Sequence, residues 1–335
     1  MNNATSESAI ASPFESAVEA IISGDAPTLE KLLHDHPELI RERSTRPHHA
    51  TLLHYVGANG VEDYRQKTPK NAVQIAKILL QSGADVEAMA DIYGGSATLG
   101  LVATSVHPFL AGVQNDLIDV LLEHGAAFDG TVDQNYKPGR LVTACLANGR
   151  GKAAEHLAHR GAPLNLEGAA GLGMLELVKT FFDHNGALQP NTTRKEAEFG
   201  FTWACEYGRT SVVDCLLQMG IDVHSVPHGE TGLHWAAYNG DVGLLSLLLN
   251  RKASVSTIDQ RFHGTPLDWA LYGWSNPPLG APSGDYYGVV RHLVAAGAKA
   301  NSSWLTNCHG GSTLLQKIQA DPNMVAALGK ELPSS

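Results

Sequence analysis

The sequence lacks the features that would point to a membrane or to nucleic acid. No apolar run approaches the roughly 20 residues that a helix needs to span a bilayer. Lysine and arginine total 24 against 34 aspartates and glutamates, a formal net charge of −10. A chain this acidic offers no positive surface for phosphate backbones or anionic lipids, so we expect neither nucleic acid nor membrane partners.

Cysteine is also scarce. The four cysteines are too few and too irregularly spaced for a disulfide framework or a zinc site. They are Cys145, Cys205, Cys215 and Cys308. The opening sequence MNNATSESAIASPFESAVEA has neither a basic nor an apolar segment of the kind found in secretory signals. We therefore expect a cytoplasmic protein with no metal and no other cofactor.

Enzyme signatures are weak or absent. The glycine-rich segment from Gly168 to Gly173 does not follow a strand in a βαβ unit, which a dinucleotide site requires. The segment from Gly149 to Lys152 lacks the upstream glycine and the Ser/Thr of a phosphate-binding loop. These absences favour a protein that is not an enzyme, although they leave the question open.

What the sequence does contain is one pattern repeated along nearly its whole length. The clearest copy, TGLHWAAYNGDVGLLSLLLNRKASV, starts at Thr231, and further copies start at Phe199 and Thr265. Each copy has a short helical run, a glycine, a leucine-rich second run and a turn. The copies start 32 and 34 residues apart, and repeats of this length indicate a stacked array. The helix pairs are predicted near residues 14–47, 48–90, 91–130, 131–164, 165–190, 191–224, 225–258, 259–304 and 305–330.

A single helix pair of this size cannot bury its own apolar face, so each pair must stack on its neighbours. Alanines such as Ala236 and Ala237 allow the first helices to approach closely, and leucine pairs add bulk to the second helices. These pairs are Leu121-Leu122, Leu216-Leu217 and Leu248-Leu249. Helix starts are expected at the threonines Thr51, Thr231 and Thr265. Left-handed C′ residues are expected at Gly83, Gly125, Gly186, Gly220 and Gly297.

The repeated motif resembles that of the ankyrin repeat family. Thr231 to Gly240 and Thr265 to Ala270 carry the resemblance best, and the pattern covers roughly residues 14–330. The resemblance implies an all-α fold, an ankyrin-repeat solenoid of stacked antiparallel helix pairs with short hairpin-like finger loops. It implies one such domain over 14–330, between flexible termini at 1–13 and 331–335, and a function in molecular recognition, with a partner protein or peptide.

One column of the repeats is a candidate binding surface. The residue after the motif histidine is expected to face outward on the first helix, at a position that the family uses for contacts on its concave face. The column reads Tyr55, Leu101, Ala144, Gly168, Trp203, Trp235 and Trp269. One helical turn after its three tryptophans stand Glu206, Tyr238 and Tyr272. Since tryptophan and tyrosine concentrate binding energy at interfaces, we expect these six residues and Trp274 to contact the partner, with Glu206 and Asp268 selecting polar or cationic groups. In the alternative reading, the tryptophans only shield the helix surface.

The motif histidines are expected to have a structural role, and three insertions have an open one. The family uses a histidine at the position of His54 and His234 to tie neighbouring fingers together. Three inserted segments are either binding loops or neutral decoration. They are Val61 to Asn71, Ser105 to Asn115, and Gly273 to Tyr287 with its aromatic residues Trp274, Tyr286 and Tyr287.

An alternative function is a small-molecule-binding protein or enzyme. The small residues Ala144 and Gly168 would leave room beside Trp203 for a pocket roofed by the inserted loops. Glu206 and Asp268 are the weak catalytic candidates, because a carboxylate against an aromatic wall can act as an acid or base. Asp268 stands where its repeat otherwise has histidine, and its simpler role would be a hydrogen bond to the next finger.

Overall fold

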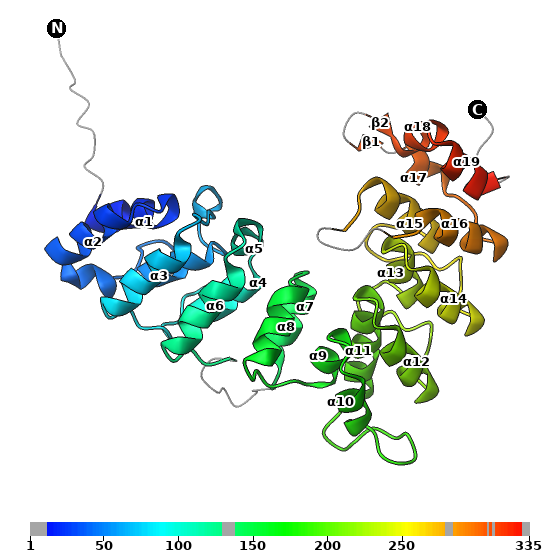
Figure 1. Ribbon diagram of the computed structural model, residues 1–335, viewed down its shortest axis with the longest axis horizontal. Helices are drawn as coiled ribbons and strands as arrows, with labels where there is room; N and C mark the ends of the chain where they lie inside the picture. Colours follow the sequence, from blue (N-terminus) through cyan, green and yellow to red (C-terminus); the bar gives the residue numbers. More distant parts are fainter. Residues whose placement is uncertain (1–11, 129–137, 279–283, 307, 310–311, 330–335) are drawn as a thin grey trace, which may run out of the picture. The chain divides into compact units, whose positions relative to one another are not determined.

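The computed structural model describes residues 12–128, 138–278, 284–306, 308–309 and 312–329. The chain divides into two compact units, Met1–Leu164 and Asn165–Ser335. Both units are built from helices, as predicted (Figure 1). The described residues also include a two-stranded antiparallel pair of β1 (Cys308–His309) and β2 (Ser312–Thr313), which directly precedes the helix at Leu314–Gln319, where a hairpin-like finger was predicted. None of the described helices has the length and apolarity that crossing a bilayer requires.

The first unit contains eight α-helices and three short 3₁₀ helices within its described part. They are α1 (Pro13–Ser23), α2 (Ala26–Asp35), η1 (Pro37–Ile40), η2 (Leu52–Gly57), η3 (Asp63–Arg65), α3 (Ala72–Gln81), α4 (Thr98–Thr104), α5 (Val106–Ala111), α6 (Gln114–Glu123), α7 (Arg140–Ala147) and α8 (Gly151–His159). First helices α1, η2, α4 and α7 contact one another in sequence, and second helices α2, α3, α6 and α8 do the same. This unit therefore consists of two rows of helices.

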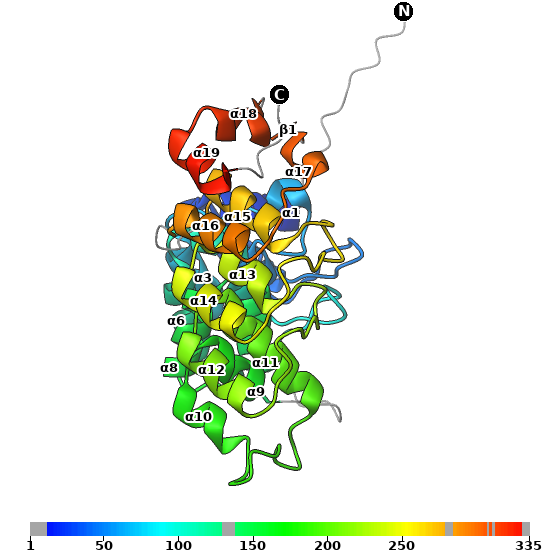
Figure 2. The same ribbon diagram turned by 90° about the vertical axis from the view of Figure 1, so that its right-hand side faces the viewer.

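The second unit has the same two-row arrangement (Figures 1 and 2). Its described helices are α9 (Leu166–Gly171), α10 (Leu175–Thr180), α11 (Arg194–Glu206), α12 (Thr210–Gln218), α13 (Gly232–Tyr238), α14 (Val242–Asn250), α15 (Pro266–Ser275), α16 (Tyr286–Ala295), α17 (Ser302–Thr306), α18 (Leu314–Gln319) and α19 (Pro322–Leu328). One row runs through α9, α11, α13, α15 and α18, and the other through α10, α12, α14, α16 and α19. The loops that precede α13 and α15 extend from the same side of these rows (Figure 2).

Alternating small and large residues explain the packing of these rows. Ala236 and Ala237 are fully buried in α13, where they let α11 and α15 pack closely on both sides. The first leucine of each predicted pair is fully buried, whereas the second is only partly buried. The five glycines predicted to end second helices all have left-handed backbones, with φ between 79° and 94°. Gly83, Gly125, Gly220 and Gly297 lie just past the ends of second helices, as predicted, whereas Gly186 does not, because α10 already ends at Thr180. The repeat pattern thus correctly predicted the buried leucines and four of the five helix ends.

Several first helices, among them η2, α13 and α15, begin with a reciprocal cap at a threonine. The backbone N–H of Thr231 donates to Nδ1 of His234 at 3.1 Å, and the Thr231 hydroxyl lies 2.7 Å from the same nitrogen. On its other side, Nε2 of His234 lies 3.2 Å from the carbonyl oxygen of Gly264 in the next finger. Thr51 and His54 form the same cap. The threonine caps were therefore predicted correctly, and His234 connects two fingers as its position implied.

Some predicted boundaries were wrong. Helix α1 begins at Pro13, where Ser12 accepts a hydrogen bond from the backbone N–H of Glu15, so the predicted flexible N-terminus is too long by at least one residue. Residues 1–11 and 331–335 of the predicted flexible ends lie outside the described residues. The insertion Ser105–Asn115 is not a plain loop, because it contains α5 and the start of α6. Likewise, α15 and α16 extend into both ends of the insertion Gly273–Tyr287.

The insertion after α15 is held at both ends. Where the chain leaves the helix, the Ser275 hydroxyl accepts a hydrogen bond from Nζ of Lys317 at 2.7 Å. Where it returns, the backbone N–H of Asp285 donates to the carbonyl oxygen of Gly240 at 2.9 Å. A Cβ at Gly240 would lie 2.7 Å from Cα of Gly284, so the backbone at Gly284 can approach this closely only because residue 240 is glycine. The two ends are therefore fixed to neighbouring repeats of the second unit.

The first insertion is anchored by buried charges. Arg65, which is 5% exposed, forms ion pairs with Glu15 at 2.6 Å, Glu19 at 3.0 Å and Glu62 at 3.5 Å. Arg46 also pairs with Glu15 and Glu62. Hydrogen bonds from Arg46 and Arg65 hold the pKa of Glu15 below its usual value, despite partial burial. The segment Val61–Asn71 is thus tied to α1, which favours the structural reading of this insertion.

Candidate functional site

The second unit brings five aromatic side chains from three successive repeats into contact. We call Trp235, Tyr238, Trp269, Tyr272 and Trp304 the aromatic cluster. Trp235 and Trp269 meet edge to face with ring centroids 5.1 Å apart, and Trp235 meets Tyr238 at 6.1 Å. Tyr272 lies 6.3 Å from both Tyr238 and Trp304. The rings of Tyr238 and Tyr272 are stacked, with planes that differ by only 22°, whereas the other contacts within the cluster are edge to face.

Trp203 lies in a separate group of rings. Its ring centroid is 4.7 Å from that of His228, which is itself 4.4 Å from the ring of Phe199. His228 belongs to the finger that precedes α13, so this finger lies against the tryptophan. Of the three column tryptophans, only Trp235 and Trp269 therefore belong to the aromatic cluster.

The expectation that the column faces outward is wrong for most of its members. Tyr55 and Leu101 are essentially fully buried, and Trp203 and Trp269 are 5% and 6% exposed. Finger loops cover the tryptophans, since His228 contacts Trp203 and Phe262 contacts Trp269 with centroids 5.9 Å apart. Trp235, Tyr238, Tyr272 and Trp304 stay partly exposed. The accessible part of the cluster is therefore these four rings.

The indole N–H groups of the three tryptophans differ in their partners. Trp203 donates to Oε2 of Glu167 at 3.2 Å, and Trp269 donates to Oδ2 of Asp259 at 3.0 Å. Nε1 of Trp235 is buried and has no hydrogen-bond partner among the described residues. The repeat register explains the difference, because Ser225 stands one repeat before Asp259, as Trp235 stands one repeat before Trp269 (259 − 225 = 269 − 235 = 34). Serine is too short to replace the carboxylate.

Two carboxylates lie beside the cluster. Glu206 ends α11 and Glu230 immediately precedes the cap of α13. Burial, reinforced by the charge of Glu230, raises the pKa of Glu206 to about 8. The pKa of Glu230, which is 6% exposed, is also raised, mainly by burial. Sequence reasoning selected Glu206 but missed Glu230, because the repeat motif does not mark the residue before the threonine cap.

Asp268 has a structural environment. Its side chain is fully buried, and Oδ2 accepts hydrogen bonds from the backbone N–H and hydroxyl of Thr265, both at 2.8 Å. Oδ1 accepts from the backbone N–H of Asn301 in the next finger at 3.2 Å. Burial is the main cause of its raised pKa. Because both oxygens are used and covered, the proposed acid or base role for Asp268 is not supported.

The aromatic residues of the third insertion also have structural contacts. Tyr286 donates its hydroxyl hydrogen to the carbonyl oxygen of Tyr238 at 3.1 Å, and Tyr287 donates to Oδ2 of Asp321 at 2.8 Å. Trp274 is partly buried against the core of the second unit, beside the hydroxyl of Tyr287. It is therefore not brought into the aromatic cluster with the other predicted binding residues.

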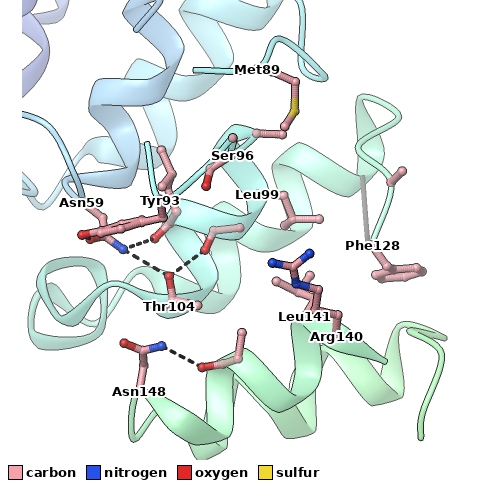
Figure 3. A pocket seen from close by; sticks show the side chains of 16 residues that line it. Asn59, Met89, Tyr93, Ser96, Leu99, Thr104, Phe128, Arg140, Leu141 and Asn148 are labelled. Carbon is pink, nitrogen blue, oxygen red and sulfur yellow. Dashed lines mark hydrogen bonds between the residues drawn. The ribbon is translucent and has the colours of Figure 1, made fainter. Parts of the chain in front are cut away.

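A pocket in the first unit is a separate candidate (Figure 3). It has a volume of about 450 Å³ and lies where α4, α7 and the finger before α4 meet. Its wall includes Tyr93, whose hydroxyl donates to Oδ1 of Asn59 at 2.9 Å, and Asn59 in turn donates to the Thr104 hydroxyl at 3.1 Å. The guanidinium of Arg140 points into it from the opposite side (Figure 3).

Small residues create this pocket. Ala144 lines it, and a Cβ added at Gly100, another lining residue, would meet nothing within 4 Å. The predicted room beside Ala144 therefore exists, but neither Gly168 nor Trp203 lines it, and neither does Glu206 or Asp268. Within the described ranges, no group of three His, Cys, Asp or Glu side chains is placed to hold a metal ion.

Comparisons with known proteins agree with the repeat pattern. Residues 201–249 match the family model for ankyrin repeats that occur in many copies. A stretch of 117 residues is 32% identical to palmitoyltransferase Hip14 from Drosophila melanogaster. This alignment covers 33% of the present chain but only 16% of Hip14, so most of that relative has no counterpart in the match.

Proposed function

The chain is an ankyrin-repeat protein, and from this premise we propose that it binds a segment of a partner protein over the accessible part of the aromatic cluster. Ankyrin repeats generally mediate protein–protein interaction. The observation that carries the proposal is the set of four partly exposed, mutually contacting rings of Trp235, Tyr238, Tyr272 and Trp304. Such rings are rigid and apolar and have polar edges, which is why tryptophan and tyrosine dominate the energetics of interfaces.

The proposed anchors differ from those predicted from sequence. Trp235, Tyr238 and Tyr272 remain contact residues, with Trp304 added. Trp203 and Trp269 support the surface from below, because their indoles are covered and hydrogen-bonded. A continuous solenoid over 14–330 and a cytoplasmic location stay predictions, as does the absence of nucleic acid partners.

Replacing Trp235 and Tyr238 together with alanine tests this function. Peptides would be selected from a random phage-displayed library on the full chain, and their Kd measured by fluorescence anisotropy. The double variant should weaken binding at least about 30-fold, the loss of one interface hot spot of about 2 kcal/mol. Tyr64→Ala, at a 60% exposed tyrosine of the first unit, is the matched control and should leave Kd unchanged. Equal affinity for the double variant and the original chain would exclude this surface.

The pocket of the first unit favours a second candidate function, the binding of a small molecule. An apolar cavity with a few convergent polar groups is the usual form of such a site, and Arg140 would suit a carboxylate or phosphate group. A small-molecule library would be screened by thermal shift. A true ligand should raise the Tm of the original chain by several °C, because it binds only the folded state. Ala144→Leu, which fills the pocket, should abolish that rise; a shift that survives the substitution would place the ligand elsewhere.

A further inference from the structure

We propose that Glu206 and Glu230, beside the partly exposed rings of the aromatic cluster, bind a positively charged side chain, a lysine ammonium or an arginine guanidinium. The inference rests on the proposed function, because that side chain would belong to the partner segment. It goes further by stating the chemistry that the partner must present and the atoms that receive it.

The geometry of the second unit brings the two carboxylates and the rings together. Asn239 follows α13 and donates its side-chain N–H to the carbonyl oxygen of Glu206 at 2.6 Å, which fixes the end of α11 against the end of α13. There the charge of Glu206 acts on the hydroxyl of Tyr238, and that of Glu230 acts on Glu206. Glu206 is thus close enough to both Glu230 and Tyr238 for their charges to interact.

Two buried atoms of this repeat have no partner among the described residues. One is Oε2 of Glu230, in a side chain that is 6% exposed, and the other is Nε1 of Trp235. A buried carboxylate oxygen without a donor is costly, as is an indole N–H without an acceptor. A peptide carrying a cationic side chain supplies both groups, since its ammonium donates to the carboxylate and a backbone carbonyl accepts from the indole. This pairing favours a peptide segment over a metal ion.

The local charges favour a cation as well. No lysine or arginine occurs between Arg209 and Arg251, while Asp214, Asp222, Glu230 and Asp241 fall in that range. Asp259 and Arg261 are the charged groups from the next finger that act on Glu230. Arg261 lies over the ring of Phe262, with its guanidinium carbon 5.0 Å from the centroid. Ring faces also attract cations.

Proton linkage gives the site a defined pH response. With a pKa of about 8, Glu206 is mostly protonated at pH 6.5 and mostly ionised at pH 8.5. A bound cation favours the ionised carboxylate, so binding releases a proton and strengthens as pH rises. We expect roughly tenfold tighter binding at pH 8.5 than at pH 6.5, with the increase levelling off above the pKa.

A small probe tests the inference without a known partner. The full chain, labelled with ¹⁵N, would be titrated with n-butylammonium chloride, a mimic of the lysine side chain, and the indole N–H signal of Trp235 followed by NMR. We expect a saturable shift with a millimolar Kd and the pH response given above. Neutral butan-1-ol should give no saturable shift, because it has the same apolar chain without the charge.

Charge-removing variants make the test specific. At pH 8.5, Glu206→Gln and Glu230→Gln should each weaken butylammonium binding at least about tenfold, and Glu206→Gln should also remove the pH response. Glu198→Gln removes one charge from the same helix away from the cluster and should have no effect. Circular dichroism of each variant would verify folding. A shift that is absent, or unaltered by both glutamine variants, would overturn the inference.

The result is separable from the proposed function. If selected peptides require Trp235 and Tyr238 but bind equally well after lysine is replaced by norleucine, recognition at the cluster stands and the cation site fails. If butylammonium binds through the two glutamates while selected peptides bind the Trp235/Tyr238 double variant as tightly as the original chain, the cation site stands and recognition at the cluster fails.

Discussion

Replacing Arg65 with methionine is expected to lower the free energy of unfolding of the first unit by about 2–3 kcal/mol. The side chain is 5% exposed and pairs with Glu15, Glu19 and Glu62, so its removal breaks three ion pairs and leaves Arg46 as the remaining cation beside Glu15 and Glu62. Methionine keeps much of the aliphatic volume, and the loss therefore measures the charge. Urea unfolding followed by circular dichroism gives the value, and hydrogen exchange of α1 would locate it.

The control for this substitution is an exposed ion pair of the same unit. Lys31 and Asp35 face each other one turn apart on α2, with side chains 76% and 41% exposed. Ion pairs between exposed side chains contribute little to stability, so Lys31→Met should leave the free energy of unfolding almost unchanged. If Arg65→Met costs no more than Lys31→Met, the network around Arg65 is solvated and does not anchor the insertion.

Gly273→Ala is expected to destabilise the second unit by about 2–3 kcal/mol. A Cβ at this position would lie 2.3 Å from the carbonyl oxygen of Tyr238, the atom that already accepts the hydrogen bond of Tyr286. Two backbones must therefore separate, a form of overpacking that outweighs the gain of about 1 kcal/mol from removing glycine from a helix. Because α13 and α15 carry the aromatic cluster, the indole NMR signals of Trp235 and Trp269 should also shift.

Gly243→Ala provides the matched comparison. This glycine is also helical, in α14, but its added Cβ would approach only the Asp241 carboxylate, at 3.4 Å. It should be neutral or slightly stabilising because alanine favours the helix. Equal effects of the two substitutions would show that close packing of α13 against α15 is not the cause.

The sequence was most informative where a residue serves its own repeat. The threonine caps, the left-handed glycines and the buried leucines depend on neighbours a few positions away or on the next repeat, so a pattern read in register was enough to place them. Residue Leu52 begins a 3₁₀ helix and not the expected α-helix. The contacts of the insertions were harder to predict, because they join distant parts of the chain. Arg65, for example, binds the carboxylate of Glu19, 46 positions away.

The candidate site was predicted only in part for a related reason. The column after the motif histidine selected Trp203, Trp235 and Trp269 equally. Their exposure depends on whether a finger folds over the indole and on whether a carboxylate accepts its N–H. For Trp269 the acceptor Asp259 comes from a finger, whereas Trp203 is covered by the finger of His228 and donates to Glu167 of α9; both acceptors lie outside the motif. Glu230 was missed because nothing in the repeat marks the residue before the cap as buried. The pocket around Ala144 was expected from residue size, although its walls were not.

Because both ends of the insertion after α15 are fixed, the insertion can change in length without moving the helices on either side. Since Ser275 is held by Lys317 and Asp285 by Gly240, residues added between these positions change the cost of closing the loop by only about 0.6 kcal/mol for each doubling. We therefore expect this junction to accept foreign sequence between Ser275 and Asp285 while the helical rows on either side keep their register.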